Sequence, residues 1–376
     1  MIALQPYVEE HPEAVFIWRT QMASMDQYTP THLAEVGQLV ARDLLRPAPE
    51  PGAGPGSLVI KPNICGGPRE GEDPSAWRHQ PGESTNVDVV RGFLEELGRM
   101  GVAPERITLT EGRSGLDLSH IFRYSGYEYM CEQAGVELMN NGRDPYGPDD
   151  LNWIPLEEGV VFREIPIVRP VNDPGVDLIG IATMKAHPLA LTTLSVKNLQ
   201  GLVAYRYKHF CHELEILEKG EDRYTPEVMS HFHTDLRARL EPGFQRHRAD
   251  DPEWTLRDEL YANRACDLLQ AVRPMVSVVE GVLARGGTGY RRGEDVLANT
   301  LVAGLNPVHV DAVATYLMGQ DPNRPNYLRV AADRGLGTRD PFAVEAFLMT
   351  SDGPEPCADL HALGRLEIHV TRSGKQ

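Results

Sequence analysis

Hydrophobic residues recur at two different spacings along this chain, and the two spacings alternate. In the segment TPTHLAEVGQLVARDLL (29–45) they recur at helical spacing, and Thr29 or Thr31 can cap the helix. A Pro- and Gly-rich linker follows at 46–57, and the apolar run that begins at Ser57 then predicts a short buried strand. The pattern therefore places a mainly helical N-terminal segment before the first strand of a sheet.

The alternation continues and predicts the fold class. We expect strands at 57–63, 106–112 and 136–141, separated by helices at 87–101 and 117–135. The sequence Ser84-Thr85-Asn86 can cap the first of these two helices. This order is typical of a largely parallel sheet covered by helices. The second half adds expected strands at 160–170, 177–184, 275–282, 300–305 and 366–372, and helices at 255–272, 309–319 and 327–335. We therefore predict an α/β fold, with a Rossmann-like parallel or mixed sheet, helices on both faces and an elaborated second half.

The overall composition is that of a globular, acidic protein. The 376 residues include 54 acidic and 37 basic side chains, which gives a formal net charge of −17. This balance argues against a general nucleic-acid binder and against docking on anionic lipid. No apolar run is long enough for a membrane span, and no secretory signal is visible. The five widely spaced cysteines form no iron–sulfur cluster motif, so we expect a cytoplasmic protein and leave open whether it is a homo-oligomer.

One stretch departs from the acidic balance. Residues 178–212 contain no Asp or Glu, although about five would be expected at the average content of the chain. Lysine and arginine give anions charge-assisted hydrogen bonds, so the stretch predicts a pocket for a carboxylate or phosphate group. The alternative is a buried apolar strand without a ligand. The basic and histidine residues of the stretch are Lys185, His187, Lys197, Arg206, Lys208, His209 and His212.

Polar side chains also follow four of the expected strands. In open α/β sheets, ligands bind beyond the carboxyl ends of parallel strands. We therefore expect these side chains to converge at one edge of the sheet, and the convergence is itself a test of the site. They are Lys61 and Asn63, Glu111, Lys185 and His187, and Glu280.

A series of short motifs occurs in a fixed order along the chain. They are KPN (61–63), TN (85–86), EG (111–112), MKAH (184–187), SVKNLQG (195–201), KHFCH (208–212), VVEGV (278–282) and NPVHVDAVATYLMG (306–319). Together they resemble the family called domain of unknown function 362. Many members of that family also carry a ferredoxin-like iron–sulfur module, and this chain lacks its cysteine clusters. The resemblance implies a site made of Lys61, Asn63, Thr85, Asn86, Glu111, Lys185, His187, Lys197, Asn198, His209, Glu280 and Asp311.

The extent of the resemblance suggests a division of the chain. It covers roughly residues 57–336, which we expect to form the α/β core, with two lobes at about 57–170 and 171–336. Residues 1–50 would then be an N-terminal helical extension. Residues 337–376 would be a C-terminal extension that packs on the core.

Lys197 lies among apolar residues in TTLSVKNLQG. An amine is costly to bury there unless it is paired or its pKa is lowered. Three roles follow: binding of an anionic substrate, structural pairing with Glu280 or Asp311, or action as a base or Schiff-base nucleophile.

Histidines are concentrated next to this stretch. His209 and His212 are three residues apart, and His231 and His233 follow. With a nearby carboxylate, these four could hold a divalent metal. The alternative is a solvated loop, in which case His187 or His209 remains a candidate acid or base.

Two Gly-rich basic segments and one cysteine are further candidates for the functional site. ARGGTGYRRG (284–293) could cradle a phosphate group, or it could be a surface turn. GGPREG (66–71) is expected to belong to a lid from which Arg69, Arg78 or His79 reaches the substrate. Cys65, close to Lys61, is either an activated nucleophile or an ordinary packing residue.

These observations favour an enzyme that acts on a small anionic metabolite by proton transfer, such as isomerisation, racemisation, elimination or cyclisation. Two alternatives stay open: a metal-dependent redox or hydrolytic enzyme that uses the His209, His212, His231 and His233 cluster, and a non-catalytic binding protein for an anionic cofactor. The expected catalytic residues are Lys185, His187, Lys197, His209, Glu111 and Glu280. The expected substrate-binding residues are Lys61, Asn63, Thr85, Asn86, Asn198, Arg206, Lys208 and Asp311.

Overall fold

The computed structural model describes most of the chain. The described residues are 2–24, 27–49, 56–66, 80–112, 119–142, 146–208, 210–219 and 224–372. No helix in these ranges is both long enough and apolar enough to cross a membrane.

The strands are short in the first half of the chain and longer in the second. They are β1 (Ile2–Leu4), β2 (Val15–Arg19), β3 (Leu45–Pro47), β4 (Ser57–Pro62), β5 (Ile107–Glu111), β6 (Glu137–Asn140), β7 (Leu151–Pro155), β8 (Glu164–Val168), β9 (Val176–His187), β10 (Leu191–Thr193), β11 (Val276–Arg285), β12 (Asp295–Gly304), β13 (Ala346–Thr350) and β14 (Gly353–Pro356).

The α-helices alternate with these strands. They are α1 (Pro6–Glu10), α2 (Pro30–Leu44), α3 (Val87–Arg99), α4 (Ser119–Tyr124), α5 (Tyr127–Ala134), α6 (Ser195–Asn198), α7 (Leu214–Lys219), α8 (Pro226–Met229), α9 (Leu236–Asp250), α10 (Leu256–Ala271), α11 (Pro307–Leu317) and α12 (Asn326–Asp333). Short 3-10 turns are η3 (Pro81–Glu83), η4 (Pro104–Arg106), η5 (Pro148–Asp150), η6 (Leu199–Leu202), η7 (Tyr205–Tyr207) and η8 (Leu360–Leu363).

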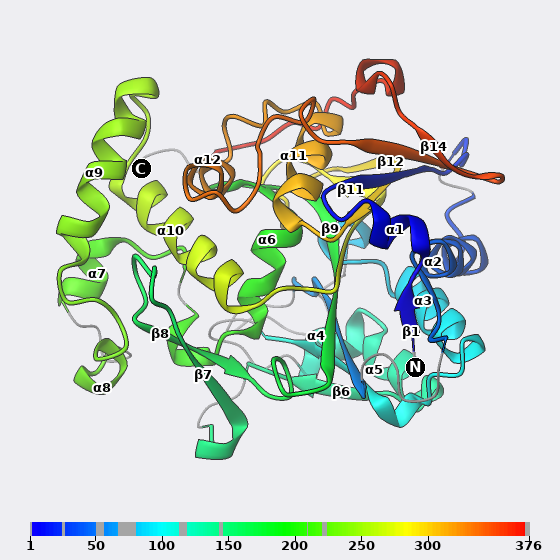
Figure 1. The fold of residues 1–376 in the computed structure, drawn as a ribbon, viewed down its shortest axis with the longest axis horizontal. Helices are drawn as coiled ribbons and strands as arrows, with labels where there is room; N and C mark the ends of the chain where they lie inside the picture. The colour runs from blue at the N-terminus through cyan, green and yellow to red at the C-terminus, as the bar shows by residue number, and fades with distance from the viewer. Residues whose placement is uncertain are drawn as a thin grey trace.

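Among the described residues, a ten-stranded mixed sheet forms the centre of the molecule (Figure 1). Its order is β14-β13-β2-β12-β11-β9-β4-β5-β6, and β10 pairs with β9. The run from β11 through β9, β4 and β5 to β6 is entirely parallel, whereas β12 is antiparallel to both of its neighbours. The carboxyl ends of β4, β5, β9 and β11 therefore share one edge, as expected for a Rossmann-like α/β sheet.

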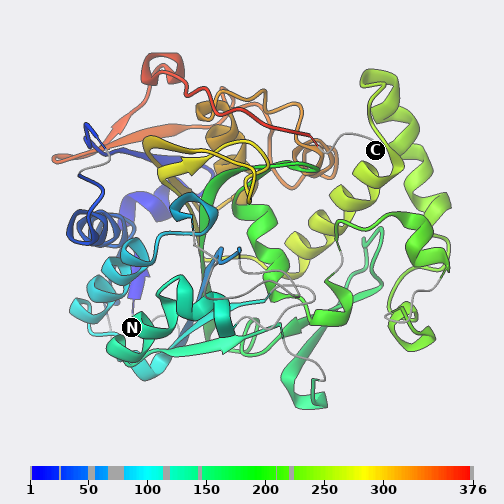
Figure 2. The ribbon, with the colours of Figure 1, turned by 180° about the vertical axis from the view of Figure 1, so that it is seen from behind.

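Both faces of the sheet are covered because neighbouring side chains on a strand point to opposite faces. On β4, Leu58 and Ile60 belong to one core with α2, α3 and α5. Val59, between them, belongs to a second core with α10 and α12. A third core packs α11 against β2, β9 and β12. Figures 1 and 2 show α2 and α3 at one end of the molecule and α9 and α10 at the other.

Several local predictions are confirmed in detail. Thr29 caps α2 through its side chain, which accepts from the backbone N–H of His32. Asn86 caps α3 in the same way, and its side-chain oxygen accepts from Asp88 and Val89. The short polar side chains before each apolar run were therefore a reliable guide to where these helices begin.

Other local predictions need correction. The expected closing strand at 366–372 is wrong: these residues form no strand, and Val370 makes only an isolated bridge to Gly287. The segment 117–135 contains two helices, because Gly126 between them has a left-handed backbone (φ +83°) that breaks the helix. The N-terminal segment holds helices α1 and α2, but it also supplies β2 to the central sheet.

Candidate functional site

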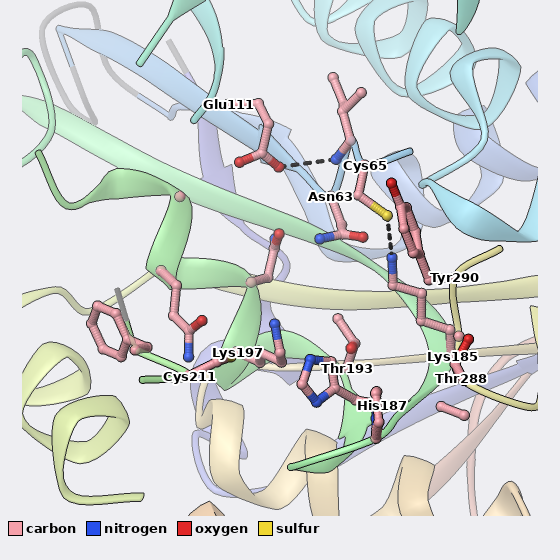
Figure 3. A pocket seen from close by; sticks show the side chains of 18 of the residues that line it. Asn63, Cys65, Glu111, Lys185, His187, Thr193, Lys197, Cys211, Thr288 and Tyr290 are labelled. Atoms are coloured by element: carbon pink, nitrogen blue, oxygen red, sulfur yellow. Dashed lines mark hydrogen bonds between the residues drawn. The ribbon is translucent and has the colours of Figure 1, made fainter. Parts of the chain in front are cut away.

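A cavity of about 640 Å³ opens at the carboxyl edge of the parallel strands. Residues at the ends of β4, β5 and β9 line it, together with α6 and the loop that follows β11 (Figure 3). The strand ends bring together Asn63, Glu111, Lys185 and His187, as the sequence pattern predicted for these four residues.

Lys61 lies beneath this cavity and is fully buried. Its Nζ donates to Glu111 Oε2 at 2.6 Å, to the carbonyl of Pro62 at 2.6 Å and to Asn198 Oδ1 at 3.0 Å. An ammonium group has three protons, so these bonds use all of them. Burial lowers the pKa of Lys61, and the Glu111 carboxylate opposes that shift. Lys61 therefore supports the site from below and has no proton left for a substrate.

Both carboxylate oxygens of Glu111 also accept hydrogen bonds from the backbone around the cavity. Its Oε2 also accepts from the backbone N–H of Ile64 at 2.9 Å, and its Oε1 accepts from Gly112 N–H at 2.7 Å. The carboxylate thus ties the loop after β4 to the end of β5. Gly201 packs directly on this pair: a Cβ atom at that position would lie 2.2 Å from Glu111 Oε1. Only glycine fits there, which accounts for one residue of the SVKNLQG motif.

Helix α6 carries Lys197 and is held by Asp311 on α11. Asp311 is buried, and its two carboxylate oxygens accept from the backbone N–H groups of Ser195 (2.7 Å) and Val196 (3.0 Å). Burial raises the pKa of Asp311 to about 7, and these two hydrogen bonds oppose the shift. Asp311 therefore acts on the site through the position of α6, and it does not line the cavity.

Replacing Asp311 by Ala is expected to destabilise the protein by about 1–3 kcal/mol, because two buried N–H groups lose their acceptor. The same change should misplace Lys197 and weaken anion binding. Urea unfolding and calorimetric titration with oxalate measure the two effects. Asp311→Asn keeps one carbonyl acceptor and should recover part of both, whereas equal loss in the two variants would contradict a positioning role.

Lys197 points into the cavity (Figure 3). Its amine has no hydrogen bond or ion pair with any residue that the structure describes. Burial lowers the pKa of Lys197, Cys211 opposes that shift, and the neighbouring Lys185 lowers the pKa further. Structural pairing with Glu280 or Asp311, one of the three roles considered for this lysine, is absent within the described ranges.

His187 is fixed in one tautomer. Its Nδ1 accepts from the backbone N–H groups of Leu189 (3.1 Å) and Ala190 (3.0 Å), so the ring proton is on Nε2. Burial lowers the pKa of His187 well below its usual value, and Lys197 and Lys185 add to that effect. The ring is therefore neutral at pH 7 and offers an Nε2–H donor to the cavity.

Lys185, near the end of β9, forms a hydrogen bond with Cys65 in the loop after β4. Its Nζ donates to Cys65 Sγ at 2.7 Å and to the carbonyl of Glu83 at 2.6 Å, and the Cys65 thiol donates to the same carbonyl. Two of its three protons are used, so one remains for a ligand.

Lys208 has a similar arrangement on the other side of the cavity. It donates to the carbonyls of Asn141 (3.0 Å) and Gly201 (3.2 Å). Burial lowers the pKa of Lys208 to about 7, and Glu111 opposes that shift. The charge of this side chain therefore changes near neutral pH.

The described lining of the cavity is strongly cationic. Its only acidic residue is Glu111, whose charge Lys61 already balances. The lining also includes two polar atoms without a hydrogen-bond partner among the described residues, Asn63 Oδ1 and Thr193 Oγ1. The lining cations are Lys185, Lys197, Lys208, Arg291 and Arg292.

Besides Lys61, five of the expected catalytic and substrate-binding residues lie away from the lining. Thr85 clamps the loop after β4, since its hydroxyl accepts from Asn63 N–H and donates to the carbonyl of Ile181. Asn86 caps α3. Glu280 lies in the middle of β11, because that strand continues to Arg285, and it accepts from Asn86 N–H and Val282 N–H. Burial raises the pKa of Glu280 to about 7. Asp311 and Arg206 also lie outside the lining.

The histidines considered as metal ligands are not gathered at this cavity. His212 lines it, whereas His231 pairs with Glu164 (2.8 Å) and stacks on Trp153, and neither His231 nor His233 belongs to the lining. No group of three or more His, Cys, Asp or Glu side chains placed to hold a metal ion occurs in the part of the chain that the structure describes. His209, Arg69, Arg78 and His79 lie outside the described residues.

Sequence reasoning missed several lining residues. Thr193, Gln200, Phe210 and Cys211 also line the cavity, but isolated polar or apolar residues of these types carry no signal in a single sequence. The acid-free stretch 178–212 contains all four, so its boundaries marked the right region without resolving its members.

Comparisons with known proteins agree with the motif order. The family model "Domain of unknown function (DUF362)" matches residues 58–316. No curated protein matches this chain. A crystal structure of a protein from Thermotoga maritima is 12% identical, with a TM-score of 0.34, and the match covers 68% of this chain and 51% of that chain. This chain thus spans about half the length of that protein. The family match extends over more than half of the sequence, from β4 to α11, and the chain belongs to the domain of unknown function 362 family.

Proposed function

We propose that this protein is an enzyme that binds a small anionic metabolite in the cationic cavity and moves a proton next to its carboxylate or phosphate group. The observation that carries the proposal is the amine of Lys197, which faces the cavity without a partner among the described residues. A lysine held in this way can be neutral near physiological pH and can accept a proton. Isomerisation, racemisation, elimination and cyclisation can all begin with that step.

The neighbouring groups support proton removal from carbon. When the Lys197 amine takes a proton from the carbon next to a carboxylate, the electron pair of the C–H bond moves toward the carboxylate oxygens. His187 Nε2–H can donate to the developing oxyanion, because a neutral imidazole is a hydrogen-bond donor that needs no prior protonation. The remaining proton of Lys185 can add a second donor. The same groups can then return the proton from Lys197 to another atom.

Deuterium exchange tests the proposal without knowledge of the substrate. The protein would be incubated in D₂O with a panel of 2-oxo, 2-hydroxy and 2-amino acids, and loss of the carbon-bound proton would be followed by NMR. We expect exchange above the uncatalysed rate for at least one compound, inhibited by oxalate, which mimics a planar enolate of a carboxylate.

Two results of these experiments would contradict the proposal. Saturable oxalate binding with no exchange across the panel would favour a non-catalytic binding protein for an anionic cofactor. Absence of any oxalate binding would contradict the anionic cavity itself.

Anion affinity should also depend on pH through Lys208. Its pKa is about 7, so its ammonium charge is present below pH 7 and is lost above it. A bound anion favours the charged form, and oxalate affinity should therefore fall by up to about tenfold per pH unit above pH 7. Calorimetric titration between pH 6 and 8.5 measures this dependence. Lys208→Met should bind oxalate more weakly at pH 6 and should flatten the dependence, and an unchanged slope would exclude Lys208 as its source.

A further inference from the structure

The loop that connects β11 to β12 is the part of the cavity to which the proposed function gives no role. It includes the Gly-rich, basic sequence GGTGYRRG (286–293), and its residues Thr288–Arg292 belong to the lining. Figure 3 shows Thr288 and Tyr290 beside Lys185, on the side of the cavity opposite Cys211.

Hydrogen bonds hold this loop in one shape. Thr288 N–H and its hydroxyl both donate to the carbonyl of Arg292, at 2.8 and 3.0 Å. Arg285, which is buried, donates from Nε to the carbonyl of Tyr290 at 3.0 Å and forms an ion pair with Asp295. Gly287 is tied to the C-terminal segment, because it donates to the carbonyl of His369. A loop fixed at these points presents its side chains to the cavity in a defined arrangement.

The loop also packs directly on the strand that carries the proposed reacting groups. A Cβ atom on Gly289 would lie 1.7 Å from the carbonyl oxygen of Ala186, and the backbone of Gly289 is in the left-handed region (φ +65°). Ala186 lies between Lys185 and His187 on β9. The close approach that glycine permits therefore fixes the basic loop beside the end of β9.

One charge of the loop, that of Arg292, belongs to the lining of the cavity. The Arg292 guanidinium is exposed and has no hydrogen-bond or ion-pair partner in the described ranges. Glu111, the only acid in the described lining, is held by Lys61 at 2.6 Å. Asp295, which follows the loop, forms an ion pair with Arg285.

The size of the cavity also indicates that the ligand is larger than a single carboxylate group. A volume of about 640 Å³ lies within the range of sites for drug-sized ligands, and it exceeds what one carboxylate group and its carbon neighbour would fill. A substrate that places one anion near Lys197 leaves room for a second group at the loop.

We propose that the loop 286–293 is a second anion subsite, which binds a phosphate group on the substrate whose reacting carbon lies beside Lys197. Arginine suits this role because its planar guanidinium can form paired hydrogen bonds with phosphate oxygens. Thr288 and the turn around Gly289 fix the backbone from which the Arg292 side chain extends. The substrate class is therefore a phosphorylated carboxylate or carbonyl compound, and this inference rests on the proposed function.

The test uses two probes on the full chain, inorganic phosphate and oxalate. Calorimetric titration of the oxalate-saturated protein with phosphate should show a second binding event. Arg292→Gln should weaken phosphate binding by about ten- to hundredfold and change oxalate affinity less than twofold. Arg324→Gln, an exposed arginine outside the cavity, is the matched control and should change neither affinity.

A second variant tests the shape of the loop without a change of charge. Gly289→Ala should displace the loop from Ala186 and weaken phosphate binding while all lining cations are kept. Simple competition between phosphate and oxalate, unchanged phosphate binding in Arg292→Gln, or no phosphate binding at millimolar concentrations would overturn the second subsite. Those results leave oxalate binding and proton exchange intact, whereas failure of the proposed function removes oxalate binding or exchange itself.

Discussion

Replacing Lys197 by Met should lower the rate of carbon-bound deuterium exchange by about 100- to 10,000-fold, the range for loss of a general base. Methionine keeps much of the length and shape of the lysine stem, so the cavity wall should survive. The melting temperature should stay the same or rise, because an unpartnered amine whose pKa is lowered by burial costs stability. Exchange kinetics and thermal unfolding measure the two effects.

The control for this prediction is Lys219→Met, which changes an exposed lysine outside the lining. It should leave both the exchange rate and oxalate affinity unchanged. A Lys197→Met variant that exchanges protons at the wild-type rate would remove Lys197 from the reaction. A variant that loses oxalate binding in proportion to rate would instead indicate that Lys197 binds the anion and does not act as the base.

The largest stability effect is expected at the buried pair of Lys61 and Glu111. Both side chains are almost completely shielded from solvent, at 0% and 5% exposure, and their charged atoms are 2.6 Å apart. Removing one partner leaves the other charge without compensation, so Lys61→Met should cost about 3–5 kcal/mol of unfolding free energy in a urea titration. Replacing both residues together by Met and Gln should cost less than the sum of the single changes.

A surface ion pair provides the matched comparison. Arg91 and Glu95 on α3 are 2.8 Å apart, but their side chains are 36% and 38% exposed. Glu95→Gln should therefore cost at most about 0.5 kcal/mol. If Lys61→Met cost no more than this control, the buried pair would not be the support of the site that its hydrogen bonds suggest.

The two predictions assign different roles to Lys61 and Lys197, two lysines that the sequence analysis placed in the same site. Both lysines were expected to hold the anion, since each lies in a short motif near the end of a strand or loop. The structure distinguishes them by their partners. The ammonium group of Lys61 donates its three protons to Glu111, Asn198 and the carbonyl of Pro62. The amine of Lys197, in contrast, has no hydrogen-bond partner among the described residues. A pocket needs both types, because free charges bind the ligand and paired charges fix the walls.

The elements of the fold could be predicted where local signals were strong. Helical spacing and a capping side chain identified α2 and α3, and short apolar runs identified β4, β5 and β9. These signals act over a few residues, so a single sequence contains them. Strand β2 was missed because the apolar run VFIWR (15–19) is short, and its partners β12 and β13 are about 280 and 330 residues away in the chain. Such pairing exists only after the sheet has assembled.

The sequence by itself determined the α/β class and the family, and it marked an acid-free, cationic stretch inside a chain of net charge −17. Local periodicity, motif order and charge are all properties of the linear chain. Only the tertiary structure decided which charged side chains are paired with other groups of the protein and which can bind a ligand. Glu280 faces the start of α3, Asp311 holds α6, and Lys61 is saturated beneath the cavity, because hydrogen-bond partners come from distant segments. The site is therefore set by which charged groups the fold leaves without a partner.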